Sequence, residues 1–100
     1  MEKSTKEVFY ENLGNRIRNT RIKQGYSGEQ LSEMANISTK YLYQIEHGHA
    51  AFSTDIFIKI CHALNVSPDI LLPSKKTDID DAILFEILGN HMAENENIQN

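Results

Sequence analysis

Apolar residues recur at intervals of three and four along most of the chain, which is the spacing of one face of an α-helix. In the first segment Phe9, Leu13 and Ile17 are four residues apart, and Ile22, five residues further on, is expected to continue the same face. Gly25 comes next, where the end of a helix can use a left-handed residue. Signals for strands are nearly absent, so the pattern predicts an all-α protein.

A second helix is predicted over residues 28–35. Ser27 and Gln30 have the spacing of a capping box, in which a hydroxyl and an amide satisfy backbone N–H groups at the start of a helix. Three apolar residues are expected to form the buried face of this helix: Leu31, Met34 and Ala35. Asn36 follows and predicts a tight turn, because its side chain tolerates the left-handed conformation.

A third helix is predicted over residues 39–47, with Ser38 as its N-cap and Gly48 at its end. Leu42 and Ile45 are its expected buried residues. The turn between the second and third helices is about three residues long, which is helix-turn-helix spacing. Many helical bundles also contain short helix pairs, so the spacing alone leaves a plain five-helix core as an equal alternative.

Two more helices complete the predicted domain, which spans residues 9–73. Ser53 is the expected N-cap of the fourth helix and Asn65 its end, and Ser67-Pro68 opens a short fifth helix. The fourth helix carries apolar residues along one side: Ile56, Phe57, Ile60, Ala63 and Leu64. A polar linker is predicted over residues 74–77.

A sixth helix is predicted over residues 78–92, followed by a disordered tail over residues 93–100. The apolar residues of this helix cover much of its circumference, whereas a surface helix on a small domain needs only one stripe. It either folds back on its own domain or pairs with a second copy, and we favour a homodimer. The expected dimerisation residues are Ile79, Ile83, Leu84, Ile87 and Leu88.

Composition narrows the class of protein. The chain has 100 residues, 40% of them hydrophobic, and no run long enough to cross a membrane or to serve as the apolar core of a signal peptide. With one cysteine it has no internal disulfide, and a cytoplasmic location is expected.

Residues 9–73 carry six Lys+Arg and six Asp+Glu, whereas residues 74–100 carry two Lys+Arg and six Asp+Glu. The acidic excess therefore lies in the last quarter of the chain.

Candidate metal ligands and nucleophiles do not form a convincing site. His47 and His49 have poor ligand spacing without nearby acids or thiolates, and His62 lies apart in the sequence. Cys61 follows Ile60 in an apolar helix and is expected to be a small buried residue. No acid, base and nucleophile fall at a useful spacing, so we expect neither an enzyme nor a cofactor.

The order and spacing of residues 12–73 resemble the phage-repressor-like (Xre-type, lambda-repressor-like) helix-turn-helix family. The most characteristic parts are Ile45-Glu46-x-Gly48 and the run Ala63-Leu64-Asn65-Val66-Ser67. The resemblance implies a five-helix domain whose third helix reads bases in the major groove of double-stranded DNA. It also implies an ion pair between Arg21 and Glu46. The positions that it assigns to DNA contact are Ser27, Gly28, Ser38, Thr39, Lys40, Tyr43, Gln44 and His49.

Within this resemblance, Gln44 suits an adenine edge, and Lys40 suits guanine or a phosphate. Tyr43 could lie on the sugar-phosphate wall or against a thymine methyl group. Three positions depart from the family pattern: Gly28 stands in place of glutamine, Ser32 in place of alanine, and the loop beginning at His49 lacks the usual cations.

The sequence therefore predicts a DNA-binding transcriptional regulator, a repressor that acts as a homodimer on a palindromic operator. A protein-interaction module or an antitoxin with the same fold is the alternative. In that case a partner protein would bind the sixth helix, and DNA binding would be secondary or lost.

Overall fold

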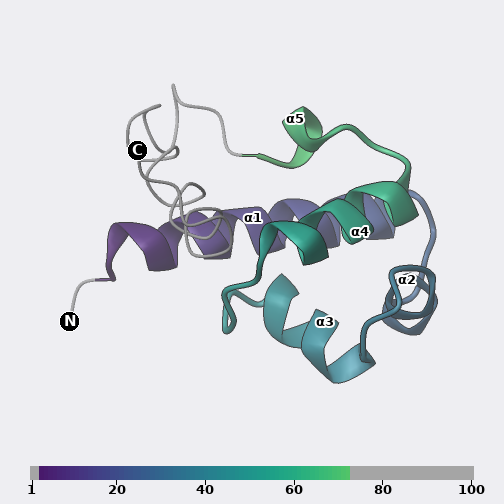
Figure 1. Cartoon of the computed structure of the whole chain (residues 1–100), viewed down its shortest axis with the longest axis horizontal. Helices are drawn as coiled ribbons and strands as arrows, with labels where there is room; N and C mark the ends of the chain where they lie inside the picture. Colours follow the sequence, from purple (N-terminus) through teal and green to yellow (C-terminus); the bar gives the residue numbers. More distant parts are fainter. Residues whose placement is uncertain (1–2, 73–100) are drawn as a thin grey trace, which may run out of the picture.

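The computed structural model describes residues 3–72, and these form helices joined by short loops and turns, as an all-α fold requires (Figure 1). The helices are α1 (Thr5–Lys23), α2 (Gly28–Met34), α3 (Thr39–Glu46), α4 (Thr54–Leu64) and α5 (Pro68–Leu71). Figure 1 shows α4 lying along α1, with α3 on one side of this pair and α5 on the other. The predicted linker, sixth helix and tail lie outside the described residues.

The first helix begins earlier than the predicted domain boundary at residue 9. The Ser4 hydroxyl accepts the Glu7 N–H at 3.1 Å, and the Glu7 carboxylate accepts the Ser4 N–H at 2.8 Å. This capping box satisfies backbone groups at the start of α1. The Ser-x-x-Glu spacing of this capping box is present in the sequence. The apolar pattern alone did not predict the first turn of α1, because no buried residue precedes Phe9.

Serine caps also begin the helices that follow. Ser27 and Gln30 form the predicted capping box, and the hydroxyls of Ser38 and Ser53 accept backbone N–H groups of α3 and α4. Ser67 occupies the N-cap position of α5 with Pro68 behind it, but its side chain makes no capping hydrogen bond. The short fifth helix is therefore started by the fixed φ of proline.

Left-handed residues stand at the predicted turns. Asn36 has φ of 58° between α2 and α3, and Asn65 has φ of 56° at the end of α4. Gly25 and Gly48 have φ of 85° and 73°. A side-chain amide or the absence of a Cβ makes these conformations accessible, which is why the chain reverses at these four points.

One core joins all five helices, and the predicted apolar faces supply most of it. Two predictions for this core were wrong, because Ile22 is 50% exposed and Met34 is 44% exposed. Ile22 lies five residues after Ile17, roughly 140° away around the helix, so the inward position falls to Arg21. Met34 lies on the outer flank of α2, because Leu31, Ser32 and Ala35 form the buried stripe.

The backbones of α1 and α3 come close together at Gly14. A Cβ at this position would overlap the carbonyl oxygen of Ile45 and crowd the backbone of Glu46. Gly14 is buried, so no side chain separates the two helices at the crossing. This contact holds α3 against the longest helix of the fold and leaves its other face pointing outward.

Candidate nucleic-acid interface

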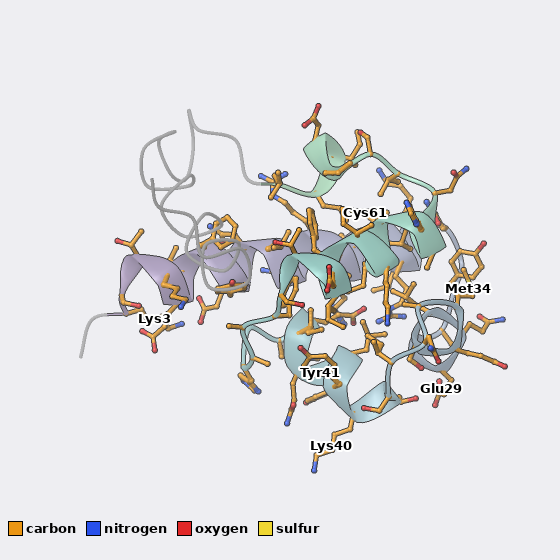
Figure 2. The ribbon with its side chains drawn as sticks, viewed as in Figure 1. Lys3, Glu29, Met34, Lys40, Tyr41 and Cys61 are labelled. Atoms are coloured by element: carbon orange, nitrogen blue, oxygen red, sulfur yellow. The ribbon has the colours of Figure 1, made fainter. Side chains whose placement is uncertain are left out.

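The two faces of α3 differ in exposure. Leu42 and Ile45 are 1% and 0% exposed and pack into the core. The opposite face carries exposed side chains from the beginning and middle of the helix: Ser38, Thr39, Lys40 and Tyr43. Figure 2 shows Lys40 extending from α3 away from the other helices. Among residues 3–72, nothing covers this polar face.

Arg21 and Glu46 hold the end of α3 to α1. The guanidinium donates from Nε to Glu46 Oε2 at 2.8 Å and from Nη2 to Glu46 Oε1 at 2.9 Å. Its Nη1 donates to the Tyr26 carbonyl oxygen at 2.9 Å. The hydrogen bonds to Glu46 raise the pKa of Arg21 above its ordinary value, against the opposing effect of burial. The expected ion pair is therefore present, with the bidentate geometry that offsets desolvation.

Ser32 and Thr39 link α2 to the first residue of α3. Their hydroxyl oxygens lie 3.0 Å apart, and the Ser32 hydroxyl also lies 3.0 Å from the Glu29 carbonyl oxygen. Ser32 is 3% exposed, whereas Thr39 is on the exposed face. Ser32 stood out in the sequence as a departure from the family pattern, but only the structure gives its hydroxyl a partner across the turn.

A hollow of about 380 Å³ lies where α1, α2 and α3 meet. It brings together three of the predicted DNA-contact residues, namely Gly28, Thr39 and Tyr43. Arg18 and Arg21 contribute cationic groups to its wall. No atom lies within 4 Å of the position where Gly28 would carry a Cβ, so the start of α2 is open on this side. Lys40 and His49 lie outside the hollow.

Tyr43 is stacked on His47, a contact that sequence reasoning missed. The ring centroids are 4.0 Å apart with 25° between the planes, and His47 Nδ1 lies 2.9 Å from the Tyr43 carbonyl oxygen. The two residues are four apart on one helix, which is the spacing at which side chains meet. Tyr43 is still 57% exposed, so one face of its ring remains accessible beside the hollow.

The loop after α3 is anchored to α1. Phe52 is 5% exposed and meets the ring of Tyr10 edge-on at 5.3 Å, and the Tyr10 hydroxyl lies 3.4 Å from the Phe52 carbonyl oxygen. Burial raises the pKa of Tyr10, and the proximity of Tyr41 adds to the shift. His49 is exposed at the start of this loop, and its backbone N–H donates to the Gln44 carbonyl oxygen at 2.8 Å. Gln44 itself is half-buried.

His47 and His49, two of the candidate metal ligands, have ring centroids 6.1 Å apart. Cys61 is a free, buried thiol on α4, and burial raises its pKa. Across residues 3–72, no three His, Cys, Asp or Glu side chains gather in a way that would hold a metal ion. The helices of the same region include none with the length and apolar character needed to span a bilayer.

This arrangement of short helices around an exposed third helix defines a helix-turn-helix protein. The family model described as Helix-turn-helix matches residues 17–71, which is more than half of the chain, so the chain belongs to that family. The resemblance seen in residues 12–73 is confirmed, and so is the five-helix, lambda-repressor-like fold of the described residues.

Relatives and solved structures agree with this assignment. The HTH-type transcriptional regulator ImmR of Bacillus subtilis is 35% identical over 72 residues, covering 68% of this chain and 57% of ImmR. An uncharacterized HTH-type transcriptional regulator of Mycobacterium tuberculosis is 34% identical over 80 residues, 73% of this chain and 57% of the relative. The chain thus spans just over half the length of these relatives. The crystal structure of the restriction-modification controller protein C.AhdI from Aeromonas hydrophila superposes with a TM-score of 0.62 at 27% identity, covering 63% of this chain and 96% of that one.

Proposed function

We propose that this chain is a cytoplasmic transcriptional repressor that binds a palindromic operator in duplex DNA as a homodimer. The observation that carries the proposal is the exposed polar face of α3, held outward by the buried contacts of Leu42 and Ile45 and by the Arg21–Glu46 ion pair. Relatives of this chain are named as transcriptional regulators, which supports the same function.

The proposed base contacts come from the exposed side of α3. Thr39 and Lys40 occupy its first turn and Gln44 follows one turn later, so one pass along the major groove brings all three near base edges. Tyr43, stacked on His47, presents a flat ring to the sugar-phosphate wall. Four further positions are assigned to the DNA backbone: Ser27, Gly28, Ser38 and His49. Contacts to phosphate fix the position of a protein on the duplex without reading sequence.

Charge sets the expected strength of binding. Residues 9–73 carry equal numbers of basic and acidic side chains, and on the outward face of α3 Lys40 is the cation. Each phosphate neutralised adds close to one unit to the slope of log K against log salt concentration. We therefore expect a shallow salt dependence and weak non-specific binding, so that base contacts carry most of the selectivity.

Homodimerisation is assigned to the helix proposed over residues 78–92, through Ile79, Ile83, Leu84, Ile87 and Leu88. Two copies would place their third helices about 34 Å apart, which matches half-sites one helical turn apart. Deletion of residues 78–100 should turn the dimer into a monomer, as measured by light scattering. A dimer of the shortened chain would show that this segment does not hold two copies together.

Selection from a pool of duplexes with a randomised centre tests DNA binding directly. The full chain should enrich a palindrome at two salt concentrations, and Lys40→Ala combined with Gln44→Ala should abolish the enrichment. Lys59→Ala is the matched control, because Lys59 is exposed on α4 rather than on α3. If the folded chain enriches no sequence, it is not a sequence-specific regulator, and the protein-interaction alternative takes precedence.

A further inference from the structure

A chain of two hydrogen bonds connects the first residue of α3 to the backbone of the first turn of α2. It runs from the Thr39 hydroxyl to the Ser32 hydroxyl and on to the Glu29 carbonyl oxygen, with 3.0 Å for each step. A hydroxyl has one proton, and a carbonyl oxygen has none and only accepts. Ser32 must therefore donate its proton to Glu29, and Thr39 must donate its proton to Ser32.

The reverse direction is unfavourable in this place. If Ser32 donated to Thr39, the Ser32 oxygen and the Glu29 carbonyl oxygen would face each other at 3.0 Å with no proton between them. Ser32 is 3% exposed, so water does not relieve the repulsion. Interactions between polar groups are strengthened in a buried setting, which makes the satisfied direction the stable one.

Thr39 consequently presents only lone pairs to the outside. Its side chain is exposed at the start of α3, while its single proton is engaged by Ser32 on the inner side. In the major groove every base pair offers one amino group, on adenine or cytosine, and one acceptor oxygen, on thymine or guanine. An acceptor-only hydroxyl matches the amino group and opposes the acceptor oxygen, so it favours the orientation of the pair that places the amino-bearing base beside it.

We infer that Ser32 is a specificity-determining positioning residue, which orients the hydroxyl of Thr39 so that α3 selects adenine or cytosine at the base that Thr39 contacts. Ser32 acts through Thr39 and does not itself touch DNA. The inference rests on the proposed function, since it requires α3 to lie in the major groove. It adds the class of base read at one position.

Lys40 provides an internal contrast. Its ammonium group only donates, so the first two residues of α3 present opposite hydrogen-bonding character to neighbouring bases. Figure 2 shows Lys40 pointing away from the helices, and none of its atoms belongs to the hydroxyl chain. A change at Ser32 should therefore leave the base preference assigned to Lys40 intact.

The test is selection from a randomised duplex pool, with sequencing, using the full chain and three variants. Thr39→Val keeps the shape of the side chain and removes its hydroxyl, so the position at which base preference disappears is the one that Thr39 reads. Ser32→Ala removes the acceptor that engages the Thr39 proton. Alanine favours helix, and the remaining Thr39 hydroxyl is exposed, so this variant should fold. Lys59→Ala, at an exposed position of α4, is the control, and circular dichroism verifies the fold of each protein.

At the base pair that Thr39 reads, replacement of adenine by purine, or of cytosine by 2-pyrimidinone, removes the amino group, and fluorescence anisotropy should show about 3- to 10-fold weaker binding of the unaltered chain, the value of one hydrogen bond. Ser32→Ala should reduce this loss to less than about 2-fold at that base pair alone, because a freed hydroxyl both donates and accepts. No loss when the amino group is removed, no position altered by Thr39→Val, or an unaltered loss in Ser32→Ala would each overturn the inference while leaving a regulator in place. Failure of the unaltered chain to enrich any sequence would instead remove the proposed function and this inference together.

Discussion

Arg21 and Glu46 are joined by two parallel hydrogen bonds, 2.8 Å and 2.9 Å long, that connect the last turn of α1 to the last residue of α3. Their side chains are 14% and 4% exposed, so the pair is largely shielded from water. A third N–H of Arg21 donates a hydrogen bond to the Tyr26 carbonyl oxygen, and this bond also holds the turn that leads into α2. One guanidinium thus positions both helices of the helix-turn-helix motif.

Removal of either partner should destabilise the fold. Glu46→Ala leaves the Arg21 charge in a shielded site without its carboxylate, and we expect a loss of about 2–4 kcal/mol in the free energy of unfolding. Arg21→Ala should cost a similar amount, because the carboxylate of Glu46 is then stranded. In urea titrations the double variant should lose less than the sum of the two single variants. Strict additivity would show that the two side chains do not interact in solution.

Replacement of Gly14 by alanine should disrupt the crossing of α1 and α3. The added methyl group would overlap the carbonyl oxygen of Ile45, which is backbone and cannot rotate away. We expect a loss of about 1–3 kcal/mol, as for overpacked sites, although alanine is the better helix former. Gly28→Ala is the matched control, because no atom lies near its Cβ position and the same change should be neutral or slightly stabilising there. Thermal unfolding of both variants makes the comparison.

Local signals in the sequence predicted the five helices of residues 3–72 and the turns between them, but not the start of α1. Serine caps, left-handed asparagines and glycines act within a few residues of themselves, so a single sequence reveals them. These local signals did not predict that Ile22 and Met34 are exposed. A helical spacing identifies an apolar stripe, but the neighbouring helices decide how wide the buried part of that stripe is.

The contacts within the candidate site were predicted less completely, because they also depend on how neighbouring helices and side chains pack. Arg21 and Glu46 were paired through the family resemblance, since 25 residues separate them in the chain. The bond between Ser32 and Thr39 spans the turn, and the ring contact between Tyr43 and His47 depends on rotamers. Neither leaves a pattern of apolar and polar positions that the sequence could display.

The turn between α2 and α3 gives a prediction about Asn36. Its φ of 58° suits asparagine and glycine but is strained for a β-branched side chain. Asn36→Gly should change the free energy of unfolding by less than about 0.5 kcal/mol, whereas Asn36→Val should lower it by about 1–2 kcal/mol. Glu33→Val is the matched control, because Glu33 is also exposed nearby but lies within α2. If both valine variants cost the same, the β-branched side chain itself, rather than the left-handed turn, explains the loss.

Alkaline pH should weaken the fold through Tyr10 and Cys61. Burial raises the pKa of both groups in the folded chain, from ordinary values of 10.0 and 9.0. The folded state therefore holds these protons more tightly than the unfolded state, and the resulting stability is fully present below the ordinary values. It is lost as the pH rises from those values through the raised ones.

We expect the free energy of unfolding, measured by urea titration, to decrease once the pH exceeds 9.0. The decrease should be smaller in Cys61→Ala and in Tyr10→Phe than in the unaltered chain. Tyr43→Phe, at a largely exposed position, serves as the control and should keep the full decrease. Parallel pH profiles for all four proteins would show that these buried groups do not link proton binding to folding.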